Sequence, residues 1–131
     1  MRSSIGKTWT VVLLASLSGC VTTESSLREK GMQPLAGSAL EAVLTAGELE
    51  HRGTNGNVVG VVFNTDHTAS VQWAGGGDEG VWRLDGDQYC VTWREIRGGA
   101  EKCFRAYKTS DTEYTAFGID GVKTGVFWRS R

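Results

Sequence analysis

The sequence predicts a mainly β fold: a small antiparallel eight-stranded barrel or meander with one short helix on its N-terminal side. From Glu48 onward, apolar and polar residues alternate with a period of two, which is typical of strands with one buried face. Clusters of turn residues recur every ~8–12 residues along the same region. No helix-length segment separates the expected strands, so consecutive strands should pair in antiparallel fashion.

The first 19 residues differ from the rest of the chain and predict an export signal. Arg2 and Lys7 are their only charged residues, and residues 8–17 form a short apolar run. A positive start, an apolar segment and small residues at the cleavage point are the parts of a secretory signal. The run is too short for a membrane-spanning helix, which needs ~20 residues.

The motif Leu17-Ser18-Gly19-Cys20 directly follows this run and resembles the bacterial lipobox. The resemblance implies cleavage before Cys20, which then carries acyl chains as the first residue of the mature protein. Two or more chains hold a protein firmly on a membrane. Val21 stands where many lipoproteins of the inner membrane carry aspartate, so the resemblance implies the outer membrane, with the domain facing the periplasm. The alternative is an ordinary cleavage site nearby, with Cys20 left unmodified.

The remaining chain divides into two parts. Residues 20–33 are polar and lack a strand pattern, which predicts a flexible tether, and residues 34–131 form the predicted barrel domain. The signal removes two basic residues and no acidic one, so the mature chain has a formal net charge of −3. This charge excludes a typical nucleic-acid-binding protein, which would be strongly basic.

One helix signal precedes the strands. Ser38 followed by Glu41 is typical of a capping box, and apolar residues follow at helical spacing, which predicts a helix over residues 38–46. Residues 58–63 are apolar on both faces, so we expect this helix to cover them or to plug one end of the sheet. Strands are predicted at residues 48–52, 58–63, 69–74, 80–84, 88–94, 102–108, 113–117 and 123–129.

The turns between these strands have recognisable residues. Asn55-Gly56, Asp85-Gly86-Asp87 and Arg97-Gly98-Gly99 suit tight connections. Asp66-His67 is also predicted as a turn, although it lacks the usual glycine.

Cys90 and Cys103 form an even pair of cysteines in a chain predicted to be exported. Such a pair favours a disulfide over a metal site. Alternation places Tyr89, Val91 and Trp93 on one face of their strand and Cys90 on the other. This parity is consistent with a bond across two paired strands, and closing so modest a loop stabilises a fold by about 3 kcal/mol.

A distinctive pattern surrounds the cysteines. It reads Gly80-Val81-Trp82-Arg83, then Asp85-Gly86-Asp87-Gln88-Tyr89-Cys90-Val91-Thr92-Trp93, then Arg97-Gly98-Gly99-Ala100-Glu101-Lys102-Cys103-Phe104. This pattern resembles an uncharacterised family of exported proteobacterial proteins, the domain of unknown function 995 family. The resemblance covers roughly residues 34–129 and implies a small barrel-like domain with bonded cysteines, without assigning an activity. The turn at Asp66-His67 departs from the Asp-Gly pattern of that family.

Segments that could carry chemistry are better explained as turns. The glycine-rich segment 75–80 has no following helix to bind a phosphate, so we expect a flexible hairpin loop. His51 and His67 have no partner at a metal-ligand spacing. We therefore predict no metal site, no cofactor and no enzymatic activity. The acidic residues near the turns lack the spacing of a calcium loop: Asp78, Glu79, Asp85 and Asp87.

Two further residue groups bear on binding. Trp73, Trp82, Trp93 and Trp128 could line a ligand pocket, but short strands enclose little space, which favours a role in the core.

Arg83, Arg94 and Arg105 are expected on the outward face of three neighbouring strands, with Arg97 and Lys102 at its end. This strip suits phosphate or carboxylate groups of an envelope component or a partner protein, and an ordinary solvated face is the alternative.

These observations predict a lipid-anchored envelope protein with a non-catalytic binding or structural role. One alternative is a periplasmic inhibitor of a lysozyme- or protease-type hydrolase, with residues 74–80 as the inhibitory loop. A second alternative is a carrier of a small apolar ligand, which requires an internal cavity.

Overall fold

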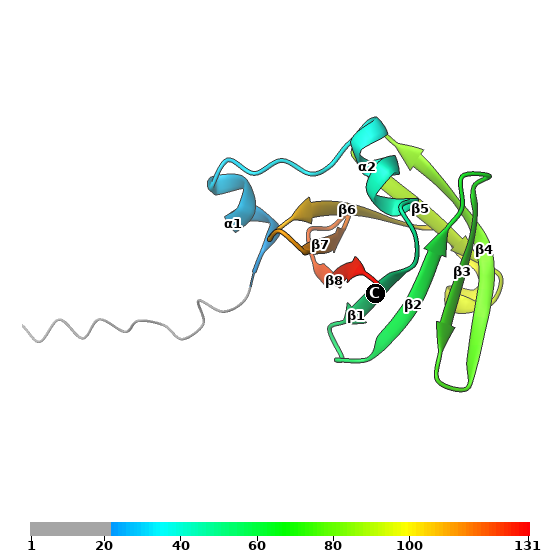
Figure 1. The fold of residues 1–131 in the computed structure, drawn as a ribbon. Coiled ribbons are helices and arrows are strands. Elements are labelled where there is room, and N and C mark those ends of the chain that lie inside the picture. Colours follow the sequence, from blue (N-terminus) through cyan, green and yellow to red (C-terminus); the bar gives the residue numbers. More distant parts are fainter. Residues whose placement is uncertain (1–21) are drawn as a thin grey trace, which may run out of the picture.

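The computed structural model describes residues 22–131, which form a closed barrel of eight antiparallel strands preceded by two short helices (Figure 1). The predicted export signal and Cys20 lie outside the described residues. Within residues 22–131, no helix is long and apolar enough to cross a membrane. The elements are α1 (Glu24–Glu29), α2 (Gly37–Leu44), β1 (Leu49–Gly53), β2 (Val58–Phe63), β3 (Thr68–Trp73), β4 (Gly76–Asp85), β5 (Gln88–Trp93), the 3₁₀ turn η2 (Ile96–Gly99), β6 (Lys102–Lys108), β7 (Glu113–Gly118) and β8 (Lys123–Arg129).

The predicted eight-stranded antiparallel barrel is confirmed. Each strand pairs with the next along the chain, and β1 closes the sheet by pairing with β8 from Leu49↔Arg129 to Gly53↔Gly125. Closure removes the two free edges that an open sheet would expose. The strand positions agree closely with the sequence predictions except at β4, which begins at Gly76 instead of residue 80.

The glycine-rich segment 75–80 is not a flexible loop. Only Ala74 and Gly75 connect β3 to β4, and Gly77 already pairs with Gln72. A side chain at Gly80 would collide with the carbonyl oxygen of Thr92 on β5. The glycines therefore permit a close approach between backbones, which is a common reason for glycine inside a strand.

The predicted turn at Asp66-His67 is present without a glycine. His67 itself adopts a left-handed backbone, with φ of 71°. The Asp66 carboxylate accepts hydrogen bonds from the backbone N–H and the hydroxyl of Thr68, at 3.0 and 2.6 Å. Because the His67 ring also stacks on Trp82, with 5.1 Å between ring centroids, packing compensates for the unusual backbone.

Helix α2 plugs one end of the barrel, which is one of the two positions that the sequence predicts for it. Leu40 and Leu44 are fully buried against the inward-facing residues of the strands. The predicted capping box is wrong, because Ala36 precedes the helix and makes no side-chain cap. The backbone N–H of Gly37 instead donates to the carbonyl of Gly86, at 3.1 Å, which fixes the start of the helix on the β4–β5 turn.

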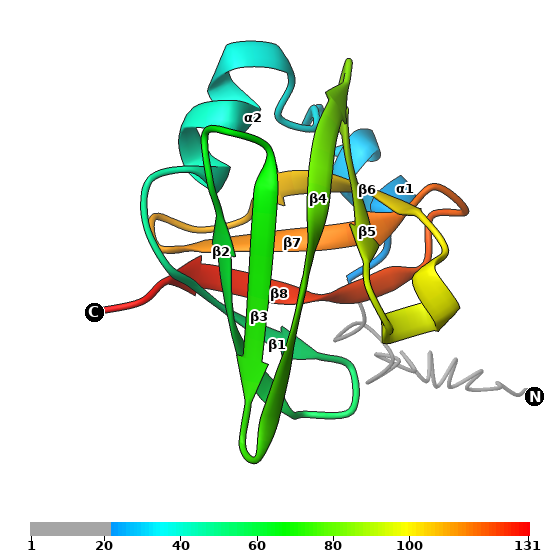
Figure 2. The same cartoon turned by 90° about the vertical axis from the view of Figure 1, so that its right-hand side faces the viewer.

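Within residues 22–131, no α-helix plugs the opposite end of the barrel in this way. It is formed by the connections β1–β2, β3–β4, β5–β6 and β7–β8, which lie at the far end of the strands from α2 (Figure 2). Large apolar side chains are exposed around this end, at Val58, Trp73, Ile119 and Val122. We call it the open end.

The predicted disulfide between Cys90 and Cys103 is confirmed, and it joins directly opposed residues of β5 and β6. The predicted face assignment also holds: Tyr89, Val91 and Trp93 are buried inside the barrel, while the bond lies on its outer side. The disulfide therefore braces the strand pair whose connection, η2, lies at the open end.

The prediction of a flexible tether over residues 20–33 is wrong for the described part of that segment. Residues 24–29 form α1, and Thr23 closes a capping box with Ser26. Leu27 is buried against Tyr107 and Phe117, which point outward from β6 and β7. An outward apolar cluster needs a cover, and α1 supplies it.

Glu24 holds α1 on the barrel and is only 6 % exposed. Its carboxylate accepts two hydrogen bonds from the Arg105 guanidinium, at 2.6 and 2.9 Å, and one from the Tyr107 hydroxyl, at 2.7 Å. The hydrogen bonds from Arg105 are the main cause that lowers the pKa of Glu24 to about 2. Arg105 is therefore neutralised by a residue that is 81 positions away in the chain.

This ion pair predicts an acid-sensitive fold. Because the pKa of Glu24 falls from 4.5 to about 2 on folding, its contribution is fully present above about pH 5 and is lost as the pH falls toward 2. We expect the free energy of unfolding to lose about 2 to 3 kcal/mol from this group across that window. Urea unfolding at several pH values measures it.

The matched variants are Glu24→Gln and Glu29→Gln, since Glu29 lies exposed on the same helix. Glu24→Gln should flatten the acid dependence, while Glu29→Gln should keep it. Equal pH profiles for the wild type and Glu24→Gln would contradict this role of the ion pair.

Candidate functional site

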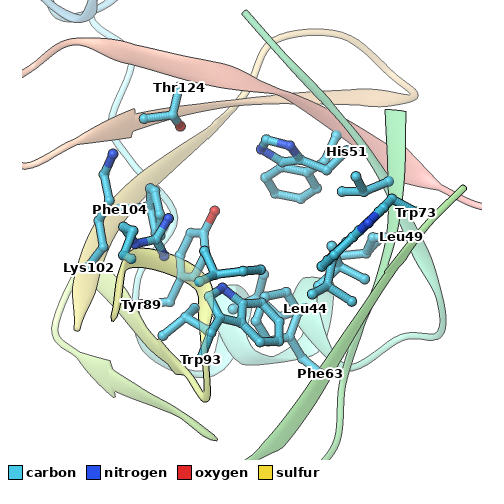
Figure 3. A pocket seen from close by; sticks show the side chains of 17 residues that line it. Leu44, Leu49, His51, Phe63, Trp73, Tyr89, Trp93, Lys102, Phe104 and Thr124 are labelled. Atoms are coloured by element: carbon cyan, nitrogen blue, oxygen red, sulfur yellow. The ribbon is translucent and has the colours of Figure 1, made fainter. Parts of the chain in front are cut away.

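A pocket of about 320 Å³ occupies the barrel interior and reaches the open end. Leu44 of the plugging helix contributes to its lining, and Trp73, from the last position of β3, stands at the open end (Figure 3). The pocket is mostly apolar. Its lining residues are Leu44, Leu49, His51, Val59, Val61, Phe63, Val71, Trp73, Tyr89, Val91, Trp93, Ile96, Arg97, Lys102, Phe104, Thr124 and Phe127.

The cavity exists because the inward-facing side chains of β2 and β3 are mostly small. Val59, Val61 and Val71 line this side of the barrel, where larger residues would fill the space. An eight-stranded barrel is just wide enough either to be filled by side chains or to hold one small ligand. The expectation that short strands enclose little space is therefore wrong.

The four tryptophans divide between roles. Trp82 and Trp93 are buried, as the core interpretation predicts. Trp73 is 40 % exposed beside the pocket, and Trp128 lies on the outer face, where its indole N–H donates to the Glu50 carboxylate at 3.0 Å. Trp73 and Trp93 both line the pocket, as the pocket interpretation predicts, and Trp128 lies outside the barrel.

Two polar side chains reach into the apolar part of the pocket. Tyr89 is 5 % exposed, and its hydroxyl points into the cavity (Figure 3) without a hydrogen-bond partner among residues 22–131. Burial raises the pKa of Tyr89, so the phenol stays protonated and can donate. Burial lowers the pKa of His51, so its imidazole is uncharged at neutral pH.

Two cations lie over the ring of Phe104 at one side of the pocket. The Arg97 guanidinium carbon and the Lys102 ammonium nitrogen lie 5.9 and 5.5 Å from the centroid of the Phe104 ring. The Tyr89 ring stacks on the same Phe104 ring, with 5.2 Å between centroids. We call the group formed by Tyr89, Arg97 and Lys102 around Phe104 the polar corner.

The polar corner lacks a carboxylate of its own. The ion pairs of the described chain engage Arg28, Arg83 and Arg105, and neither Arg97 nor Lys102 has an acidic group within 4.0 Å. No acidic residue is among those that line the pocket. The described residues thus gather two positive charges and a phenolic donor at one edge of an apolar cavity.

Asp78 fixes the turn that carries Arg97. Its buried carboxylate accepts hydrogen bonds from the backbone N–H groups of Ile96 and Glu95, both at 2.9 Å, and of Glu79, at 2.8 Å. The bonds from Ile96, Glu95 and Glu79 lower the pKa of Asp78. Asp78 is a structural anchor of η2, which the sequence expectation of a simple turn residue missed.

This anchoring offsets an unfavourable backbone. Arg97 adopts a left-handed conformation, with φ of 58°, which is uncommon for a residue with a side chain. Such conformations persist where the surroundings determine them, and they concentrate at functional sites. Asp78 therefore holds Arg97 next to the pocket.

The expected strip of Arg83, Arg94 and Arg105 is not a free cationic surface. Arg83 donates to both oxygens of Glu101, at 2.8 and 2.9 Å, and Arg105 is covered by α1 and bound to Glu24. Arg94 is exposed at the end of the strip. Among the described residues, Arg97 and Lys102 also make no ion pair, and they lie at the pocket, whereas the sequence placed them at the end of this strip.

Residues that resemble a metal site are already bonded. Cys90, Glu101 and Cys103 bring potential ligand atoms within 4.8 Å of one another. Both sulfurs belong to the disulfide, so they are not thiolate ligands.

Comparisons with protein-family models, with curated proteins and with solved structures find no match to this chain. The fold and the pocket therefore define the class, a small closed β-barrel with an internal apolar cavity, and its use has to be argued from the geometry.

The anchoring of η2 is directly testable. Asp78→Asn removes the carboxylate that accepts from Glu95 and Ile96, so we expect faster amide hydrogen exchange at both residues and a lower thermal midpoint. Asp111→Asn is the matched control, since Asp111 is exposed at the other end of the barrel. Unchanged exchange at Glu95 and Ile96 in Asp78→Asn would show that the turn does not depend on this anchor.

Proposed function

We propose that this protein is a lipid-anchored envelope protein that binds a small, largely apolar ligand inside its barrel. In this proposal Cys20 carries the acyl anchor on the periplasmic side of the outer membrane, and the role is non-catalytic. The single observation that carries the proposal is the apolar cavity of about 320 Å³ that opens at the unplugged end. Apolar cavities with a few convergent polar groups are the usual form of small-molecule sites.

The size of the cavity limits the ligand. Its volume is about twice the roughly 150 Å³ of a protein cavity that accepts benzene. The cavity therefore has room for a ligand of roughly a dozen non-hydrogen atoms. Apolar side chains at the open end, such as Trp73 and Val58, give such a molecule a favourable route into the pocket.

The geometry favours a carrier over the hydrolase-inhibitor alternative. An inhibitory loop at residues 74–80 has less support, because residues 76–80 belong to the paired strand β4. The cavity, in contrast, is the feature that a carrier requires and that a structural role leaves unused.

A fluorescent apolar probe tests the proposal. N-phenyl-1-naphthylamine gains fluorescence in an apolar site. Its naphthalene ring is within the size limit of the cavity and its phenyl ring can extend through the open end, so we expect saturable enhancement with the wild-type protein. Val71→Trp, whose added ring occupies the cavity, should abolish the enhancement, and the overpacking is expected to cost about 1–3 kcal/mol of stability.

Val81→Trp is the matched control, because Val81 is 55 % exposed on the outer face of β4. It adds the same ring outside the pocket and should leave probe binding unchanged. Circular dichroism establishes that both variants are folded. Equal enhancement by folded Val71→Trp and wild-type protein would exclude the cavity as the binding site.

A further inference from the structure

The polar corner constrains the chemistry of the ligand beyond its apolar character. Tyr89 offers a hydroxyl donor with no described partner, and Arg97 and Lys102 add two charged donors around the same Phe104 ring. A buried donor without a partner is costly, and nearly all such groups in folded proteins are satisfied by protein, water or ligand. Tyr89 therefore calls for an acceptor that the described chain does not supply, and the two cations of the polar corner favour a negatively charged one.

We propose that the pocket selects amphiphiles with an oxyanion head, such as a medium-chain carboxylate, and this inference rests on the proposed ligand-binding function. The head lies at the polar corner and accepts hydrogen bonds from the Tyr89 hydroxyl, Arg97 and Lys102. The apolar body lies against the opposite side of the pocket, which Leu49, Val61 and Val71 line.

The arrangement of the side chains supports this orientation. Lys102, Phe104 and Tyr89 lie on one side of the cavity, and Leu49 and Trp73 lie across from them (Figure 3). A ligand with one polar end and one apolar end matches this division, and a molecule that is polar or apolar throughout does not. Charge-assisted hydrogen bonds to an oxyanion are about twice as strong as neutral ones, so the head adds selectivity.

The charges around the pocket favour an anion over a cation. Arg97 and Lys102 are the charged residues of the lining, His51 is uncharged at neutral pH, and no acidic residue lines the cavity. A cationic amphiphile would bring a third positive charge to this site, where no carboxylate compensates for it. A neutral alcohol could satisfy Tyr89 but would leave both cations without a counterion.

The test compares ligands that share one chain and differ in the head. Decanoate, decanol and decyltrimethylammonium are titrated by calorimetry, below the micelle concentrations of the two ionic ligands and the solubility limit of decanol. The protein is the full chain carrying Cys20→Ser, so that no acyl group of its own competes for the pocket. We expect decanoate to bind about tenfold or more tightly than decanol, and decyltrimethylammonium to bind most weakly.

Variants then test whether the oxyanion head of decanoate binds at the polar corner. Arg97→Asn with Lys102→Gln removes both charges, and asparagine tolerates the left-handed backbone at position 97. This double variant should weaken decanoate binding about tenfold while leaving decanol within about twofold. Tyr89→Phe should weaken decanoate by a smaller factor. Lys108→Gln is the control, since Lys108 is exposed at the plugged end.

The outcomes separate this inference from the function on which it rests. Decanol binding as tightly as decanoate, with Val71→Trp blocking both, would overturn the oxyanion selectivity and leave an apolar carrier. Equal loss of decanoate binding in Lys108→Gln and the double variant would also overturn it, because the effect would then be one of net charge. Absence of binding by both decanol and decanoate would overturn the proposed function itself.

Discussion

Closure of the sheet between β1 and β8, with a plug at only one end, is the constraint on which the site depends. A closed ladder satisfies the backbone of every strand and separates an interior from the solvent. Leu40 and Leu44 of α2 seal one end and belong to the same core as the strands. Among the described residues, the other end carries turns and no α-helix, so the space between the small side chains of β2 and β3 is accessible from there.

Several local interactions place Arg97 and Lys102 at the open end. The disulfide holds β5 to β6, and Asp78 binds the backbone of the turn between them. That turn presents Arg97, and the first residue of β6 presents Lys102 to the same aromatic ring. The disulfide, the turn that Asp78 binds and the charges of the pocket therefore belong to one β-hairpin. A change in the disulfide or in Asp78 should also affect ligand binding.

Much of the fold could be predicted because strand patterns are local. Alternation along residues 88–93 gives the correct inner face, and the parity of Cys90 and Cys103 gives their bond. Helix α1 could not be predicted in this way, since six residues with little apolar periodicity dock through Glu24 and a distant Arg105. From the sequence, the pocket is only the alternative interpretation of the tryptophans, for a related reason. Alternation identifies inward residues, but the volume that they leave depends on how all eight strands meet.

Native mass spectrometry of the protein extracted from its own envelope reports what the barrel holds in the cell. We expect a species acylated at Cys20, with the Cys90–Cys103 bond intact and an additional small anionic molecule that is released on unfolding. The same preparation of Val71→Trp should lack that molecule. A wild-type protein that is acylated but empty, or a molecule retained equally by Val71→Trp, would contradict a carrier role for the cavity.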